Sequence, residues 1–199
     1  MMKWNNIVWI GLTALVAAQL PAGAEELKVY DTVLNFQLPD NWRQVGTDEL
    51  GGMFSAEFLP QEQRLADWTS LVCVQGFHGM GDRITPQAFF ETFTNNYKAN
   101  CLGEMVYEPL GALEMATGEQ SGFQAILGCS RMPDTHLHGE PSSRGEIGYY
   151  AVLGGGEDLL LMHKSMRGLE FTAANVPLNG SNYREFIAPL QPIKLNQSN

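Results

Sequence analysis

The densest group of possible metal ligands in this sequence lies between residues 134 and 140. Asp134, His136, His138 and Glu140 alternate with other residues there. Residues two apart point to the same side of an extended chain, so the four side chains would share one face. Two imidazoles with carboxylates suit zinc or copper. The alternative, which we favour, is a polar surface loop without a cofactor, because prolines and a glycine interrupt the stretch.

Three cysteines, Cys73, Cys101 and Cys129, allow one disulfide in three possible pairings. We favour Cys101–Cys129, because Cys101 lies on the apolar stripe of a predicted helix and Cys129 on the apolar face of a predicted strand. Both would point into one helix–sheet interface. Cys73 lies inside an apolar run and is then expected to be a buried, unreactive thiol. The alternative is a reactive Cys73 with His78, on the following loop, as its base.

Other patterns that carry catalysis or nucleotide binding are missing from the sequence. The glycine-rich stretch 76–82 lacks the lysine and the glycine spacing of phosphate-binding loops. The three glycines 154–156 are better explained by the backbone geometry of a turn. There is no G-x-S-x-G, H-E-x-x-H or C-x-x-C sequence. His163, in an apolar strand, is expected to be a half-buried structural residue. The sequence leaves enzymatic activity open but favours a protein without it.

Aromatic residues offer a weaker indication of a ligand groove, which Trp42 and Trp68 could line. Tyr149 and Tyr150 are adjacent in a predicted strand, so they should face opposite sides of it. On that basis at most one of the two tyrosines belongs to the core. The other is then available as an exposed contact residue.

The strands that position these residues are indicated by alternating or continuous apolar residues. They are expected at residues 34–38, 53–59, 71–74, 105–115, 123–129, 147–153 and 159–166. The last two flank a glycine-rich turn and should form a hairpin. Because most neighbouring strands are joined by short turns, the sheet should be mostly antiparallel.

Two helices are expected beside these strands. The first begins at Pro86 with Thr85 as its N-cap, repeats aromatic residues at helical spacing over Phe90–Tyr97, and can end at Gly103. The second is short and covers Tyr183–Leu190. The predicted fold class is α+β, a mostly antiparallel β-sheet of about six to seven strands with a central helix and a C-terminal helix packed on it.

The segment Phe36–Trp42, which reads FQLPDNW, resembles the strand-Pro-x-x-Trp start of proteins with the Mog1/PsbP-like fold. The order of the predicted elements is also similar to that group. The resemblance implies the α+β fold of the group. Its members bind diverse partners and share no catalytic residues, so the resemblance implies neither an activity nor a role for any residue.

Residues 1–24 have the order of a secretory signal peptide. Lys3 is followed by the apolar run Ile7–Leu20 and the small residues of 22–24. The run is shorter than the ~20 residues that span a bilayer comfortably. We expect cleavage near Ala24, no membrane insertion afterwards, and one α+β domain over residues 25–199. The mature protein should be periplasmic or secreted, where a disulfide can persist.

The net charge of the chain limits the kinds of molecule that it is expected to bind. Its 199 residues include 12 basic and 22 acidic ones, a formal net charge of -10. Such a chain repels nucleic acid and anionic membranes and suits a protein partner with a basic surface. The favoured hypothesis is an exported, non-catalytic binding or interaction protein of unknown specific role. The alternatives are a periplasmic metal-binding protein that uses residues 134–140, and an immunity or inhibitor-type protein for a secreted enzyme.

Overall fold

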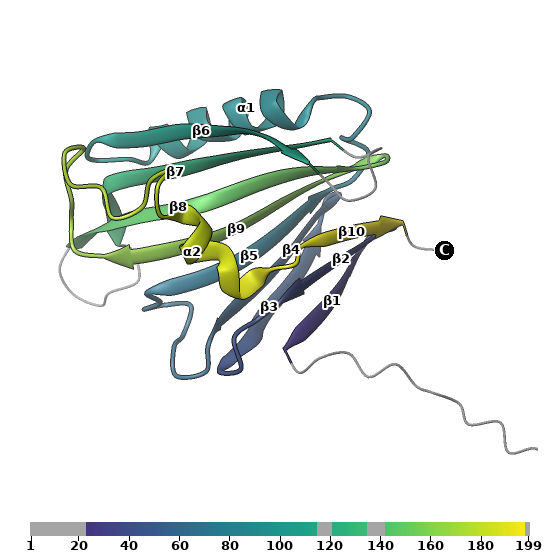
Figure 1. Ribbon diagram of the computed structural model, residues 1–199, viewed down its shortest axis with the longest axis horizontal. Coiled ribbons are helices and arrows are strands. Elements are labelled where there is room, and N and C mark those ends of the chain that lie inside the picture. Colours follow the sequence, from purple (N-terminus) through teal and green to yellow (C-terminus); the bar gives the residue numbers. More distant parts are fainter. Residues whose placement is uncertain (1–22, 115–120, 135–141, 198–199) are drawn as a thin grey trace, which may run out of the picture.

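The computed structural model of the chain describes residues 23–114, 121–134 and 142–197. Strands predominate among these residues (Figure 1). The first half of the chain forms β1 (Ala24–Val29), β2 (Thr32–Gln37), β3 (Trp42–Leu50), β4 (Met53–Pro60), β5 (Ser70–Phe77) and α1 (Pro86–Ala99). The second half forms β6 (Met105–Glu114), β7 (Ser121–Asp134), β8 (Ser142–Gly155), β9 (Asp158–Gly168), α2 (Tyr183–Ile187), a 3₁₀ turn (Ala188–Leu190) and β10 (Lys194–Gln197). The fold class is α+β, as the sequence predicts.

The described strands form two sheets, and every pairing between them is antiparallel. The larger sheet has seven strands in the order β3-β4-β5-β9-β8-β7-β6, and the smaller has the order β1-β2-β10. The antiparallel arrangement and the size of the main sheet agree with the prediction. The second sheet was not predicted, because β1 and β10, which flank β2 in it, carry no clear apolar alternation. The edge strand β3 of the larger sheet was missed for the same reason.

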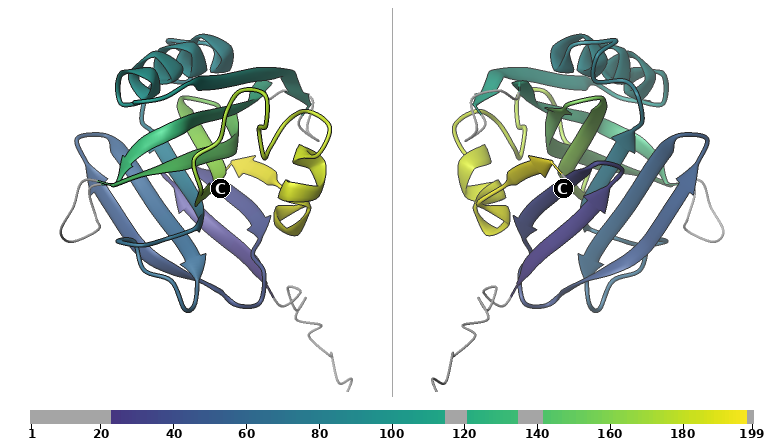
Figure 2. Two further views of the ribbon diagram at one scale, coloured as in Figure 1. Left: turned by 90° about the vertical axis from the view of Figure 1, so that its left-hand side faces the viewer. Right: turned by 90° about the vertical axis from the view of Figure 1, so that its right-hand side faces the viewer.

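Both faces of the seven-stranded sheet are covered. One face packs on the small sheet and α2, and its core includes Leu34, Phe36 and Phe58. The other face packs beneath α1, where Phe90 is fully buried. Figures 1 and 2 show α1 lying along the sheet on the side away from α2 and β10. Because both faces are covered, Tyr149 and Tyr150 are both buried, and the prediction that at most one belongs to the core was wrong.

Local sequence signals account for α1. The Thr85 hydroxyl accepts a hydrogen bond from the Ala88 N–H at 3.2 Å, and Pro86 is the first helical residue. The helix ends at Ala99 with Asn100 as its C-cap, before the predicted stop at Gly103. Neither α1 nor any other helix in the described ranges has the length and apolar character needed to cross a membrane.

Candidate functional sites at the two ends of the sheet

The predicted metal ligands fall at the connection between β7 and β8. Asp134 is the last residue of β7, and His136, His138 and Glu140 lie outside the described residues. Within the described ranges, no three His, Cys, Asp or Glu side chains are grouped so that they could hold a metal ion. The zinc or copper site therefore stays a prediction.

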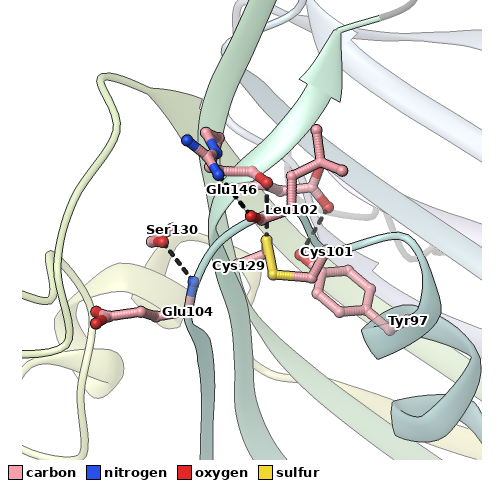
Figure 3. Close-up of a disulfide and its surroundings, with 8 residues drawn as sticks. Tyr97, Cys101, Leu102, Glu104, Cys129, Ser130 and Glu146 are labelled. Carbon is pink, nitrogen blue, oxygen red and sulfur yellow. Dashed lines mark hydrogen bonds between the residues drawn. A yellow bond between two sulfur atoms is a disulfide. The ribbon is translucent and has the colours of Figure 1, made fainter.

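Cys101 and Cys129 form a disulfide, the pair that the sequence favours. It joins the end of α1 to β7 (Figure 3). The chain beside it is held by further bonds, since the Leu102 N–H donates to the Arg131 carbonyl at 3.0 Å. The Glu104 N–H donates to the Ser130 hydroxyl at 2.8 Å. The disulfide thus lies in a densely bonded corner at one end of the sheet.

Cys73 is the remaining thiol and is buried in β5. Burial, with a smaller contribution from the Glu57 carboxylate, raises the pKa of Cys73 to about 12. His78, the base considered from the sequence, lies beyond the far end of β5, where its Nδ1 bonds Asp158 Oδ1 at 2.9 Å. The residue opposite Cys73 in β9 is His163, and burial lowers the pKa of that imidazole to about 4. Thiol and imidazole are both uncharged at neutral pH, which disfavours a reactive cysteine.

A buried ion pair between β8 and β9 was not anticipated from the sequence. Arg167 Nε donates to Glu146 Oε2 at 2.6 Å, and the guanidinium lies over the Trp68 ring at 4.2 Å. The Tyr97 hydroxyl also donates to Glu146, at 3.3 Å. In the β8–β9 hairpin, Glu146 lies opposite Arg167. The register of the hairpin predicted from the sequence could therefore have indicated this pair. The Arg167 guanidinium is therefore occupied by contacts within the chain, on the face of the sheet that α1 covers.

The segment Leu169–Pro177, here called the strap, leaves β9 and crosses β8 toward β6 (yellow-green in Figure 1). Its Phe171 N–H faces the Ser130 carbonyl at 3.4 Å, and its Ala173 N–H donates to Glu104 Oε2 at 2.7 Å. Gly145 lets the strap approach, because a Cβ there would lie 2.7 Å from the Phe171 ring. The strap is thereby fixed against the sheet.

A cavity of about 400 Å³ lies between the strap and the sheet; we call it the strap pocket. Its lining is mainly apolar and includes Ile147, Met166, Leu169, Phe171 and Pro177. A smaller hollow beside it shares Met166 and Pro177 and adds Leu178 and Phe186. Leu169 is 93% exposed, which is unusual for a large apolar side chain. This combination is typical of a ligand pocket with a partly open mouth.

The opposite end of the sheet carries a different surface, here called the acidic end. Four turns meet there, and its exposed carboxylates are those of Asp31, Asp48, Glu49, Asp82 and Glu157. None of these five forms an ion pair with another described residue. Leu50 and Met53, which flank the β3–β4 turn, are 76% and 44% exposed. The acidic end therefore presents negative charge around two apolar side chains.

Contacts between the turns hold the acidic end together. The His78 N–H donates to the Gly52 carbonyl at 2.9 Å, and the Gly81 N–H to the Glu157 carbonyl at 2.7 Å. The Tyr30 ring lies 4.9 Å from the His78 ring. Burial raises the pKa of Tyr30, and the nearby carboxylates of Glu49 and Asp158 raise it further. The four turns thus form one surface.

No family model matches the chain, and no curated protein matches it. Solved structures do match. The solution structure of cyanobacterial PsbP (CyanoP) from Synechocystis sp. PCC 6803 is 13% identical, with a TM-score of 0.45 over 89% of this chain and 91% of that one. A mutant of the protein Mog1 is 10% identical, with a TM-score of 0.43 over 81% and 83%. The Ran-binding protein Mog1p of Saccharomyces cerevisiae is 8% identical, with a TM-score of 0.42 over 85% of each chain. These structures are of PsbP and Mog1, the two proteins after which the fold group resembled by Phe36–Trp42 is named. Similarity at this level indicates no function.

Proposed function

We propose that this chain is an exported, non-catalytic interaction protein that binds a partner with a basic surface through its acidic end. The observation that carries the proposal is the group of five exposed carboxylates around Leu50 and Met53. Apolar side chains ringed by charge are a common composition for protein–protein contacts.

Electrostatics favour this surface as the contact. The nearby exposed cations, Lys28 and Arg83, are fewer than the carboxylates, and the whole chain carries a net charge of -10. Repulsion among unpaired carboxylates is relieved when a basic surface is brought against them. The same field accelerates encounter with such a partner and weakens as salt rises.

Hydrogen bonds beneath the acidic end hold its surface in one conformation before a partner binds. Asp158 is 2% exposed and accepts hydrogen bonds from His78 Nδ1 and from the Gly79 N–H, at 2.9 and 3.0 Å. The turns are therefore fixed from behind before a partner arrives. A fixed surface loses little conformational entropy on binding.

Export is the second part of the proposal. It is supported by the secretory pattern of residues 1–24 and by the Cys101–Cys129 disulfide, which suits an oxidising compartment. A nucleophilic role for Cys73 is disfavoured by its burial in β5 and by its raised pKa, which keeps the thiol protonated at neutral pH.

A capture experiment tests the proposed function. The mature chain, residues 25–199, is used to pull down proteins from its native extract at low and high salt. The test variant combines Asp31→Asn, Asp48→Asn and Glu49→Gln. The matched control combines Glu26→Gln, Glu62→Gln and Glu185→Gln, which are exposed and remove the same charge elsewhere.

We expect a stoichiometric, salt-sensitive partner whose affinity falls ~10-fold or more in the test variant and less than about twofold in the control. Equal losses in both variants would mean that net charge alone drives binding. Unchanged binding in the test variant would place the contact elsewhere. Either result would overturn the role of the acidic end.

Two other hypotheses from the sequence stay predictions. An inhibitor or immunity-type role is a special case of binding a basic protein, and it requires the captured partner to be a secreted enzyme that loses activity in the complex. The metal-binding hypothesis predicts that zinc or copper raises the melting temperature of the chain. That rise should vanish when His136→Ala and His138→Ala are combined.

A further inference from the structure

We propose that the strap pocket binds one small, uncharged, apolar molecule. This site lies at the end of the sheet opposite the acidic end, and the inference does not depend on the proposed function. It is carried by the shape, lining and charge of the cavity beneath the strap.

The pocket is preformed in the chain. Its floor contains Ile147, which is 1% exposed, and Met166 from the neighbouring strand. Its roof contains Phe171, which packs against Gly145 so closely that a Cβ at Gly145 would collide with the ring. Because the strap is tied to Glu104 as well, neither wall needs to move to create the cavity. A preformed cavity of about 400 Å³ falls in the range of small-molecule sites.

The lining favours an apolar ligand. Carbon-rich side chains surround most of the cavity, and apolar surface removed from water on both molecules drives binding. Asn175 and Glu170 are the polar side chains that contribute to the lining on the strap. The Glu170 carboxylate accepts a hydrogen bond from the Ser143 hydroxyl. The Asn175 amide is left as a group that can orient a hydroxyl or carbonyl on the ligand.

The charges around the pocket disfavour an anion. Glu170 lines the pocket and Glu185 lines the adjoining hollow. Arg167 is held by Glu146 and Trp68, and Lys164, a residue that is 8% exposed, donates to the Phe186 carbonyl at 2.6 Å. Arg144, which lines a further hollow with Glu170, donates to the Trp68 and Arg167 carbonyls at 3.3 and 3.4 Å. These cations already have partners within the chain, so an anionic ligand would meet the carboxylates with little compensation. An uncharged ligand agrees best with the charges around the pocket.

Two residues on the pocket allow a sharp test. Gly168 ends β9 opposite Gly145, and a Cβ built on Gly168 meets no atom within 4 Å. The change Gly168→Leu can therefore be made without a backbone clash, and it adds an apolar side chain at a residue that lines the pocket. Leu169→Asp places a charge in the lining from a side chain that is exposed, so the fold should tolerate it. Ala112→Leu, an exposed site on the edge strand β6, serves as control.

The probes are N-phenylnaphthylamine, which is neutral and fluoresces in apolar sites, and anilinonaphthalene sulfonate, which adds one negative charge to the same ring system. Titrations use the mature chain, and melting curves check that each variant is folded. We expect one saturable site for the neutral probe, with affinity for the sulfonate lower by ~10-fold or more. Gly168→Leu and Leu169→Asp should each weaken the neutral probe by at least ~10-fold, while Ala112→Leu should change it less than about twofold.

Each other outcome would overturn the inference. Failure of the neutral probe to saturate means that no such site exists. Binding that survives both Gly168→Leu and Leu169→Asp means that the probe lies elsewhere on the chain. Equal binding of the two probes refutes the preference for an uncharged ligand. If Gly168→Leu does not fold, Leu169→Asp alone decides the location.

Discussion

The two ends of the seven-stranded sheet use charge in opposite ways. At the strap end, Arg167 pairs with buried Glu146. Glu104 holds the strap through the Ala173 N–H. At the acidic end the five exposed carboxylates have no ion-pair partner among the described residues. The Glu146–Arg167 pair therefore serves the structure at the first end, and the exposed carboxylates are free for a partner at the second.

This difference has a physical basis in burial. A charge removed from water must be paired and hydrogen-bonded, or it costs several kcal/mol. A charge left in water costs little and can act over roughly a Debye length, about 8 Å at physiological salt. Substitutions of the Glu146–Arg167 pair should therefore lower the free energy of unfolding. Substitutions of the exposed carboxylates at the acidic end should lower the affinity for the partner, and the following predictions test this difference.

The largest effect is expected for Arg167→Met. The change leaves the Glu146 carboxylate buried without its cation, and the free energy of unfolding should fall by about 3–5 kcal/mol. Adding Glu146→Gln removes the orphaned charge and should recover most of the loss. The comparable change at the acidic end, Arg83→Met, should cost less than ~0.5 kcal/mol because Arg83 is exposed. Urea unfolding measures all three, and similar losses at both ends would break the comparison.

Removal of the disulfide should have the next largest effect. Combining Cys101→Ser and Cys129→Ser opens a loop whose ends are 28 residues apart and should lower the free energy of unfolding by about 3 kcal/mol. The acidic end lies at the other end of the sheet, so affinity for the captured partner should stay within about twofold at a temperature where the variant is folded. Denaturant unfolding with and without reductant checks the first part. A large loss of partner affinity would contradict the second.

His163, in β9 of the large sheet, allows a pH test of the cost of burying a titratable group. Burial lowers the pKa of His163 to about 4, whereas an unfolded histidine has a pKa of about 6.5. Between these values the unfolded chain binds a proton that the folded chain does not. Stability is therefore lost as pH falls from about 6.5 to 4, by about 2 kcal/mol for this half-buried ring.

The measurement is urea unfolding at several pH values for the wild type and His163→Gln. His163→Gln should flatten the loss of stability across this pH window. A slope that is unchanged in His163→Gln would show that other groups control the acid response.

The smallest effect on stability is expected at the acidic end. The combined Asp31→Asn, Asp48→Asn and Glu49→Gln variant removes exposed charges that have no described ion pairs. Its free energy of unfolding should stay within about 0.5 kcal/mol of the wild type. Thermal unfolding checks this. A loss of several kcal/mol would mean that these carboxylates are structural, as at the strap end.

Elements whose signals are local were predicted well. The N-cap at Thr85, the proline at the first turn and the β8–β9 hairpin depend on residues close together in sequence. The irregularity in β6 falls between Pro109 and Gly111, residue types that interrupt a regular strand. The pairing of Cys101 with Cys129 was also favoured correctly, because helix and strand periodicity give the direction of each side chain.

Elements that depend on distant partners were missed. β3 is an edge strand with a mostly exposed surface, and β10 has four residues, so neither carries a strong apolar pattern. The prediction that only one of Tyr149 and Tyr150 belongs to the core was wrong because the small sheet and α2 cover one face of β8 and α1 covers the other. The strap pocket forms because the strap folds back over β8, and no local periodicity or capping signal in residues 142–177 predicts that return.

The sequence by itself determined the α+β class, the main helix, the hairpin after β8 and the acidic balance of the chain. These follow from periodicity, capping and composition, which act over a few residues or over the whole chain at once. Only the tertiary structure decided that the small sheet covers one face, that Tyr97 and Trp68 contact the Glu146–Arg167 pair, and that five exposed carboxylates lie around Leu50 and Met53 at one end. Those features depend on which surfaces meet, and burial at such contacts sets the cost of every charge there.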